Sequence, residues 1–187
     1  MNNEYEIIAS LLKSKRDDEH YERASYDAFL DRNPISVSVP VIHIVGTNGV
    51  AEVGNFLENV YLAKGYKVGL FSSKENGPYN EMIKINGKPL SEPAFVNIFN
   101  NYQKAFDKHE LTDLEIVSYM AYHAFNLEPL DLIIVESNIG GLEDATRIPS
   151  ILPTLSIITN VSLNLSDLVG KTESQISNNF SAISAPK

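Results

Sequence analysis

Short apolar runs rich in valine, isoleucine and leucine alternate along this chain with longer stretches of helical periodicity, and this alternation leaves few folds open. Four such runs occur at residues 41–45, 67–72, 130–136 and 154–159. Continuous apolar runs of this length are typical of strands that are buried on both faces of a sheet. Strands that alternate with helices build βαβ units, whose parallel sheet is covered by helices on both faces. The sequence therefore predicts an α/β fold with three layers and a mostly parallel sheet.

The segments around these runs predict the remaining elements. Apolar residues recur at helical spacing in residues 4–13, 24–30, 52–64, 91–107 and 112–126, and a further helix begins at residue 173. Residues 81–90 are predicted to form a hairpin, because Asn86-Gly87 between two short apolar stretches is the strongest short turn signal. We expect a helical lead-in over residues 1–39, followed by an α/β domain over residues 40–187.

Composition argues against several classes of protein. The formal net charge of -9, with lysine and arginine gathered only in short, interrupted clusters, argues against a nucleic-acid partner. The absence of cysteine excludes disulfides, zinc–thiolate sites and thiol nucleophiles. No apolar run reaches the ~18 residues of a membrane span, and the acidic N-terminus lacks the features of a signal peptide. We expect a cytoplasmic protein that has neither a nucleic acid nor a membrane as its partner.

The first predicted strand is followed directly by Gly46-Thr47-Asn48-Gly49 and then by a helix. Ligands of open parallel sheets bind at the carboxyl ends of the strands. Glycines let the backbone approach a ligand, and a helix N-terminus presents free N–H groups to an anion. This loop is therefore a candidate phosphate site, although an ordinary strand-to-helix turn explains the four residues equally well.

A series of short motifs extends this loop into a family pattern. In order along the chain they are residues 41–49, 65–73, 80–87, Leu111-Thr112 with Glu115, 131–136, Gly140-Gly141, Asp144-Ala145-Thr146 and 158–160. In this order and spacing the chain resembles folylpolyglutamate synthase, also dihydrofolate synthase, of the Mur ligase superfamily. The resemblance covers about residues 21–187.

The resemblance implies a P-loop-type fold like the central domain of the Mur ligases. It also implies an ATP-dependent amide ligation, in which ATP phosphorylates a folate carboxylate and the amine of glutamate displaces the phosphate. ATP and Mg²⁺ are the implied cofactors, and a nucleotide or a folate is the implied ligand. The chain stops at Lys187, before the further strands and the C-terminal ligase domain of full family members. We therefore expect a truncated form of this fold.

The candidate phosphate loop departs from the family sequence G-T-N-G-K-G-S at its last three positions. The candidate nucleotide-binding residues are Gly46, Thr47, Asn48, Gly49, Val50, Ala51 and Glu52. Val50 stands where the family has the lysine that pairs with the β- and γ-phosphates, Ala51 replaces a glycine, and Glu52 replaces a serine. If Glu52 faces the loop, it repels a phosphate about 4 Å away by roughly 4 kcal/mol at an effective dielectric near 20. This repulsion exceeds the ~0.3–1 kcal/mol attraction of a helix N-terminus. Alternatively, Glu52 is only a favourable first-turn helix residue.

Other family positions are partly retained. Ser73 and Glu136 match the positions that bind magnesium, and both end predicted strands. The family's third metal ligand, a histidine, is Leu165 here, and its modified lysine is Phe180. His43 lies inside an apolar run and is predicted to be a core residue.

Three functions remain open for such a chain. The first is a degenerate synthase relative that keeps a binding or scaffolding role. The second is an active ATP-dependent folate/glutamate ligase component that a partner chain completes, and the third is a decayed gene product. We favour the first, a folylpolyglutamate synthase-like nucleotide-binding domain that is not catalytically competent alone. The strands missing from its sheet predict a homo-oligomer, or a partner chain that covers the sheet.

Overall fold

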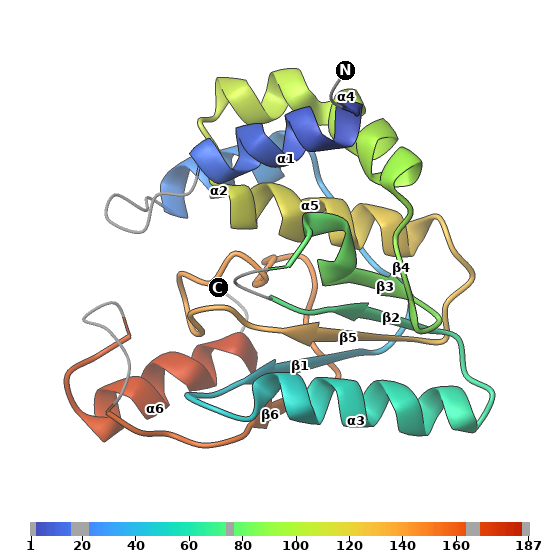
Figure 1. The fold of residues 1–187 in the computed structure, drawn as a ribbon. Helices are drawn as coiled ribbons and strands as arrows, with labels where there is room; N and C mark the ends of the chain where they lie inside the picture. Colours follow the sequence, from blue (N-terminus) through green and yellow to red (C-terminus); the bar gives the residue numbers. More distant parts are fainter. Residues whose placement is uncertain (1–2, 16–22, 74–76, 164–168, 185–187) are drawn as a thin grey trace.

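The computed structural model describes residues 3–15, 23–73, 77–163 and 169–184, and its centre is a six-stranded sheet (Figure 1). The strands lie in the order β4-β3-β2-β5-β1-β6. Their bounds are β1 Val41–Val45, β2 Val68–Phe71, β3 Ile83–Ile85, β4 Lys88–Pro89, β5 Leu132–Glu136 and β6 Leu155–Ile158. The strands β2, β5, β1 and β6 are parallel, and β3 and β4 form an antiparallel hairpin at one edge. The predicted α/β fold with a mostly parallel sheet is confirmed, and each predicted run contains one of the parallel strands.

Helices cover both faces of this sheet (Figure 1). One helix, α3, lies on one face; α5 lies on the other, with α1, α2 and α4 stacked beyond it. A further helix, α6, packs near the end of β1. The bounds are α1 Glu4–Ser14, α2 Arg23–Arg32, α3 Val50–Ala63, α4 Glu92–Lys108, α5 Asp113–Asn126 and α6 Glu173–Ser181, with 3₁₀ turns at Tyr79–Met82 and Ala182–Ser184.

All five residues of β1 are buried, because side chains on both faces of the strand meet helices. Ile42 and Ile44 belong to the apolar cluster beneath α3, whereas Val41 belongs to the cluster on the α5 side. Successive side chains of a strand point to opposite faces, so a strand between two helical layers is mostly apolar on both faces, with His43 as the polar residue of β1. This requirement explains why the central strands appear in the sequence as continuous apolar runs.

The predicted hairpin is confirmed, and its turn residues have the required backbone geometry. Asn86 and Gly87 have φ values of 53° and 77°, and a tight hairpin turn of the favoured type needs positive φ at both positions. The Asn86 side chain also accepts a hydrogen bond from the Val68 N–H (2.9 Å). The turn therefore fastens the hairpin to the neighbouring strand β2.

The helix after the first strand starts earlier than its apolar spacing indicates. α3 begins at Val50, two residues before the predicted start, because Gly49 caps the helix with a φ of 82°. That left-handed conformation is easily adopted only by glycine. None of the described helices is long and apolar enough to span a membrane.

Candidate functional site

The four parallel strands run in one direction, so their carboxyl ends lie at the same end of the sheet. Here β1 runs into residues 46–49 and α3, and β2 runs into Ser72 and Ser73. At the same end of the sheet β5 is followed by Ser137 and β6 by Thr159. The fold therefore brings the candidate phosphate loop and both candidate metal positions to the carboxyl ends of the parallel strands.

The candidate phosphate loop is fastened to the chain that leaves β6. The Thr47 N–H donates to the carbonyl oxygen of Asn160 (3.1 Å), and the Asn48 N–H donates to Oδ1 of the same residue (2.8 Å). The Thr159 hydroxyl donates to the Asn48 carbonyl oxygen (2.7 Å), and a Cβ atom on Gly46 would overlap this hydroxyl. Glycine at position 46 is therefore required by the close approach of Thr159, and two N–H groups of the loop are already used within the protein.

The first turn of α3 contains the three residues at which the loop departs from the family sequence. Val50 is half-buried and packs against the apolar cluster between α3 and the sheet, whereas Ala51 and Glu52 are exposed. A carboxylate in the first helical turn stabilises the helix through its dipole. Because Glu52 is exposed, water and salt also weaken its repulsion of an anion. The helix N-terminus thus offers N–H groups to an anion but no side-chain cation.

Of the two candidate metal positions, Glu136 is the last residue of β5, whereas Ser73 follows the end of the adjacent strand β2 by two residues. The side chains of both contact other groups of the protein. Glu136 is only 2% exposed; one of its carboxylate oxygens accepts from the Ser72 hydroxyl (2.6 Å), and the other lies where a Cβ atom on Gly54 would be. The Ser73 hydroxyl donates to the carbonyl oxygen of Ser137 (3.3 Å). Ser72, which the sequence did not single out, is therefore the hydroxyl that meets this carboxylate. The strand register could have indicated it, since β2 and β5 pair residue by residue up to Phe71 beside Val135, one position before these two residues.

The described residues gather no cluster of metal-binding side chains beside Glu136. Among the described residues, no group of three or more histidine, cysteine, aspartate or glutamate side chains could hold a metal ion. The carboxylate of Glu136 faces α3 rather than solvent. Leu165, which the resemblance aligns with the third metal ligand, lies outside the described residues.

The loop after β5 is organised by one buried carboxylate. Oδ2 of Asp144 accepts from the N–H groups of Asn138 (2.8 Å), Ile139 (2.9 Å) and Gly140 (2.7 Å). Its Oδ1 accepts from both the N–H (2.9 Å) and the hydroxyl of Thr146. Asp144 is fully buried, so these donors replace the water that an ionised carboxylate requires. Asp144 therefore holds the conformation of the loop, and its carboxylate interacts with backbone N–H groups of the protein and not with a ligand.

Phe180, at the position of the family's modified lysine, is a core residue. Its side chain is fully buried in a cluster with Val45, Val169, Ile176 and Ile183. Its ring also lies so close to Gly140 that a Cβ atom there would be 2.8 Å from it. An aromatic ring packed in this way supplies no group that could bind a nucleotide or a metal.

The prediction that His43 is a core residue is confirmed. Its Nε2 atom lies 2.9 Å from both the Ser137 and the Thr146 hydroxyl oxygens, and the side chain is 3% exposed. Burial lowers the pKa of His43 to about 4, opposed by the charge of Asp144 and assisted by that of Arg147.

This depressed pKa predicts a loss of stability in mild acid. The unfolded chain binds a proton on His43 near pH 6.5, whereas the folded chain does so only near pH 4. The free energy of unfolding should therefore be unaffected by His43 above pH 7 and fall by about 2 kcal/mol between pH 7 and pH 5. Urea unfolding at the two pH values measures this fall in the wild type and in His43→Gln. The fall should be smaller in the variant by about this amount, and an equal fall in both proteins would contradict the prediction.

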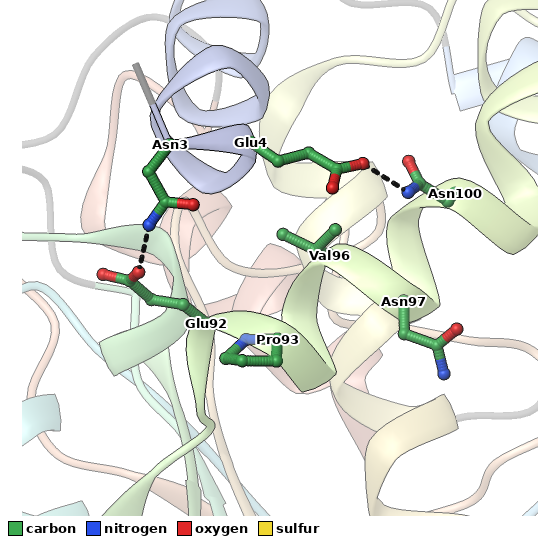
Figure 2. A pocket seen from close by; sticks show the side chains of 7 residues that line it. All are labelled: Asn3, Glu4, Glu92, Pro93, Val96, Asn97 and Asn100. Atoms are coloured by element: carbon green, nitrogen blue, oxygen red, sulfur yellow. Dashed lines mark hydrogen bonds between the residues drawn. The ribbon is translucent and has the colours of Figure 1, made fainter. Parts of the chain in front are cut away.

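A hollow of about 400 Å³ lies between α1 and α4, on the side of the sheet opposite α3 (Figures 1 and 2). Four of its polar side chains form two hydrogen bonds with one another. The Asn3 amide donates to Glu92 (2.7 Å) and the Asn100 amide donates to Glu4 (2.8 Å). These two contacts fasten α1 to α4, and the hollow contains none of the candidate nucleotide-binding residues.

Comparison with known proteins identifies the relatives of this chain. No protein-family model matches it. The dihydrofolate synthase/folylpolyglutamate synthase of Buchnera aphidicola is 36% identical over 137 residues, which make up 73% of this chain and 32% of that protein. The chain is a homologue of the folylpolyglutamate and dihydrofolate synthases. The folylpolyglutamate synthase of Lacticaseibacillus casei is 30% identical over 76% of this synthase homologue and 34% of its own length.

Solved structures agree with the sequence relatives and confirm the resemblance. The ligand-free L. casei folylpolyglutamate synthase superposes on this synthase homologue with a TM-score of 0.83 and 27% identity. A folylpolyglutamate synthase in complex with AMPPCP and folate superposes with a TM-score of 0.84 and 28% identity. Both comparisons cover 98% of this chain and 46% of the solved one. The synthase homologue thus spans less than half of the solved chains, and its matches cover about a third of the curated relatives.

Proposed function

We propose that this chain is a folylpolyglutamate synthase-like nucleotide-binding domain that binds ATP weakly or not at all and has no ligase activity alone. The observation that carries the proposal is Val50 at the first position of α3, where its half-buried side chain packs against the apolar cluster on the sheet. A lysine at such a position places an ammonium group beside the phosphates, and valine supplies none. A solved homologue binds AMPPCP, so weak ATP binding here is a departure within the family.

The rest of the loop supports weak binding. The N–H groups of Thr47 and Asn48 already donate to Asn160, and Glu52 adds a negative charge to the first turn of the helix. The attraction that remains comes from the N-terminus of α3 and is worth ~0.3–1 kcal/mol. Micromolar affinity requires about 8 kcal/mol. The loop therefore lacks most of what an ATP site needs.

Isothermal titration with Mg-ATP tests this proposal directly. The chain, shown to be folded by its melting transition, should give no saturable heat below about 1 mM nucleotide, because neither a lysine nor a free hydroxyl faces the phosphates. A dissociation constant in the low micromolar range would contradict the proposal. Titration with folate alone, in the same buffer, shows whether a binding role without nucleotide survives.

The second candidate function is an ATP-dependent folate/glutamate ligase component that a partner chain completes. The retained glycine geometry at Gly46 and Gly49 favours it. Such a component still has to bind ATP, so the same titration separates the two candidates. A decayed gene product, the third possibility, predicts neither ligand binding nor a stable partner. In each case we propose residues 1–39 as a helical lead-in and residues 40–187 as the nucleotide-binding domain.

A further inference from the structure

Three asparagines of this chain are followed directly by glycine: Asn48, Asn76 and Asn86. Such an asparagine can lose its side-chain amide without an enzyme, because glycine has no Cβ atom to keep its backbone nitrogen away from the preceding side chain. Asn76 lies outside the described residues. Asn48 and Asn86 are both exposed, so water reaches both side chains and it is their contacts that distinguish them.

The hairpin turn holds Asn86 at both its backbone and its side chain. Its N–H donates to the Val68 carbonyl oxygen (2.8 Å), and its Oδ1 atom accepts from the Val68 N–H (2.9 Å). Ring closure on the nitrogen of Gly87 requires this side chain to rotate toward its own chain and away from β2. That movement takes the partner from the N–H of the buried Val68, at the cost of a buried hydrogen bond. The fold therefore protects Asn86.

The side chain of Asn48 is held by no such contact. Among the described residues, neither this side chain nor the N–H of Gly49 makes a hydrogen bond. The N–H of Asn48 donates to Oδ1 of Asn160 (2.8 Å), and its carbonyl oxygen accepts from the Thr159 hydroxyl (2.7 Å). The loop thus holds the main chain of Asn48 and leaves both reacting groups, the side-chain amide and the Gly49 nitrogen, free.

The surroundings of Gly49 also favour the reactive form of its nitrogen. The nucleophile is the amide nitrogen after loss of its proton, and resonance shares the negative charge with the carbonyl oxygen of Asn48. The Thr159 hydroxyl donates to this oxygen, and α3 begins at the next residue, so the positive end of the helix dipole lies beside the charge. The carboxylate of Glu52 opposes this effect, but it is exposed, and water and salt screen it. The site therefore stabilises the attacking anion.

We propose that Asn48 is a site of spontaneous deamidation in the folded protein, with the Gly49 nitrogen as nucleophile and the Thr159 hydroxyl as the group that promotes its attack. A bond forms between this nitrogen and Cγ of Asn48, and the bond from Cγ to Nδ2 breaks. Ammonia leaves with the proton from Gly49, and a succinimide ring remains. Water then opens the ring at one of its two carbonyl carbons and gives aspartate or isoaspartate, with no change of oxidation state.

The reaction alters the loop permanently. Either product adds a negative charge to a loop that Glu52 already makes acidic. Isoaspartate also inserts its Cβ atom into the main chain, between the N–H that Asn160 binds and the carbonyl that Thr159 binds. Deamidation uses only water and needs no nucleotide, so the inference goes beyond the proposed function.

Peptide mapping by mass spectrometry, after incubation of the folded chain at neutral pH, measures deamidation at each asparagine separately. Each product is heavier by the difference between OH and NH₂, and aspartate and isoaspartate separate by chromatography. We expect Asn48 to react about tenfold or more faster than Asn86, the effect of the hydrogen bond of about 1.4 kcal/mol that Asn86 has to break. In urea both should react at similar rates, because both precede glycine. The Asn48 rate should rise nearly tenfold from about pH 7 to about pH 8, since the attack needs a deprotonated nitrogen.

Variants of Thr159 test the promoting hydroxyl. Thr159→Val keeps the shape of the side chain and should slow the reaction of Asn48 by about threefold or more, whereas Thr159→Ser should react like the wild type. Asn48→Gln should abolish the fast product. The Asn86 rate is the internal control, because it rises if a variant unfolds the chain.

Two results would overturn the proposal. One is a folded wild type in which Asn48 reacts no faster than Asn86, a comparison that needs no variant. The other is a folded Thr159→Val variant in which Asn48 reacts at the wild-type rate or faster while the Asn86 rate stays the same.

Discussion

Mg-ATP should bind measurably to a variant in which Val50, Ala51 and Glu52 are replaced together by lysine, glycine and serine. The variant adds a cation at the first position of α3, removes a carboxylate from the first turn, and frees the backbone approach. The backbone conformation it relies on is already present, since Gly49 has the left-handed geometry that starts the helix. We expect nucleotide affinity to rise by about 100-fold, the effect of roughly 2.7 kcal/mol from one new ion pair with the phosphates and one removed repulsion.

Glutamylation of folate should remain absent in this variant. Phe180 is still buried where the family has a modified lysine, and Glu136 still faces Gly54 rather than solvent. Isothermal titration measures the binding, and an assay of phosphate release with folate and glutamate measures turnover. Turnover would show that the chain is a competent ligase component.

A charge-matched control separates a repaired loop from a general gain in positive charge. Leu127→Lys combined with Glu128→Ser makes the same change of charge at two exposed residues beyond α5, and it should leave nucleotide affinity unchanged. The glycine at position 51 costs the helix about 1 kcal/mol, which a thermal melt checks. No binding by a triple variant whose thermal melt shows that it is folded would show that the loop backbone itself no longer accepts a phosphate.

Asp144→Ala is expected to lower the free energy of unfolding by about 3–5 kcal/mol. The substitution leaves four backbone N–H groups and a hydroxyl without the carboxylate that accepts from all of them. Unsatisfied buried donors cost ~1–3 kcal/mol each, and loop relaxation with entry of water recovers part of the sum. This loss is a large fraction of the stability of an ordinary domain. Urea unfolding followed by circular dichroism measures it.

Glu143→Ala provides the matched control for this loss. It removes the same charge one residue away, but Glu143 is exposed, so its stability should stay within about 0.5 kcal/mol of the wild type. A decrease of less than about 1 kcal/mol in Asp144→Ala would show that the loop does not depend on its carboxylate. If Asp144→Ala does not fold at all, the loss of stability exceeds the expected range. Normal folding of Glu143→Ala then still shows that the loss comes from the buried carboxylate.

For the candidate site, the sequence predicted where in the fold its residues lie, but it did not predict which groups their side chains contact. It predicted that residues 46–52 follow one strand and that Ser73 and Glu136 end two others of one parallel sheet. The strand order confirms that these segments meet at the carboxyl ends of the strands, although β2 ends at Phe71, two residues before Ser73. The sequence did not predict that Glu136 turns to Ser72 and Gly54. The site roles of these residues stay predictions, as does the division of the chain at residue 39.

The sequence by itself determined the strands, the hairpin and the family. Each depends on local patterns: the apolar run at residues 41–45, the Asn86-Gly87 turn, and motifs in a fixed order. Tertiary structure alone decided which distant groups meet. For example, Oδ1 of Asn160 accepts a hydrogen bond from the N–H of Asn48, 112 residues away. The packing of strands and helices around a shared core determines such contacts, and the local periodicity of the sequence does not predict them.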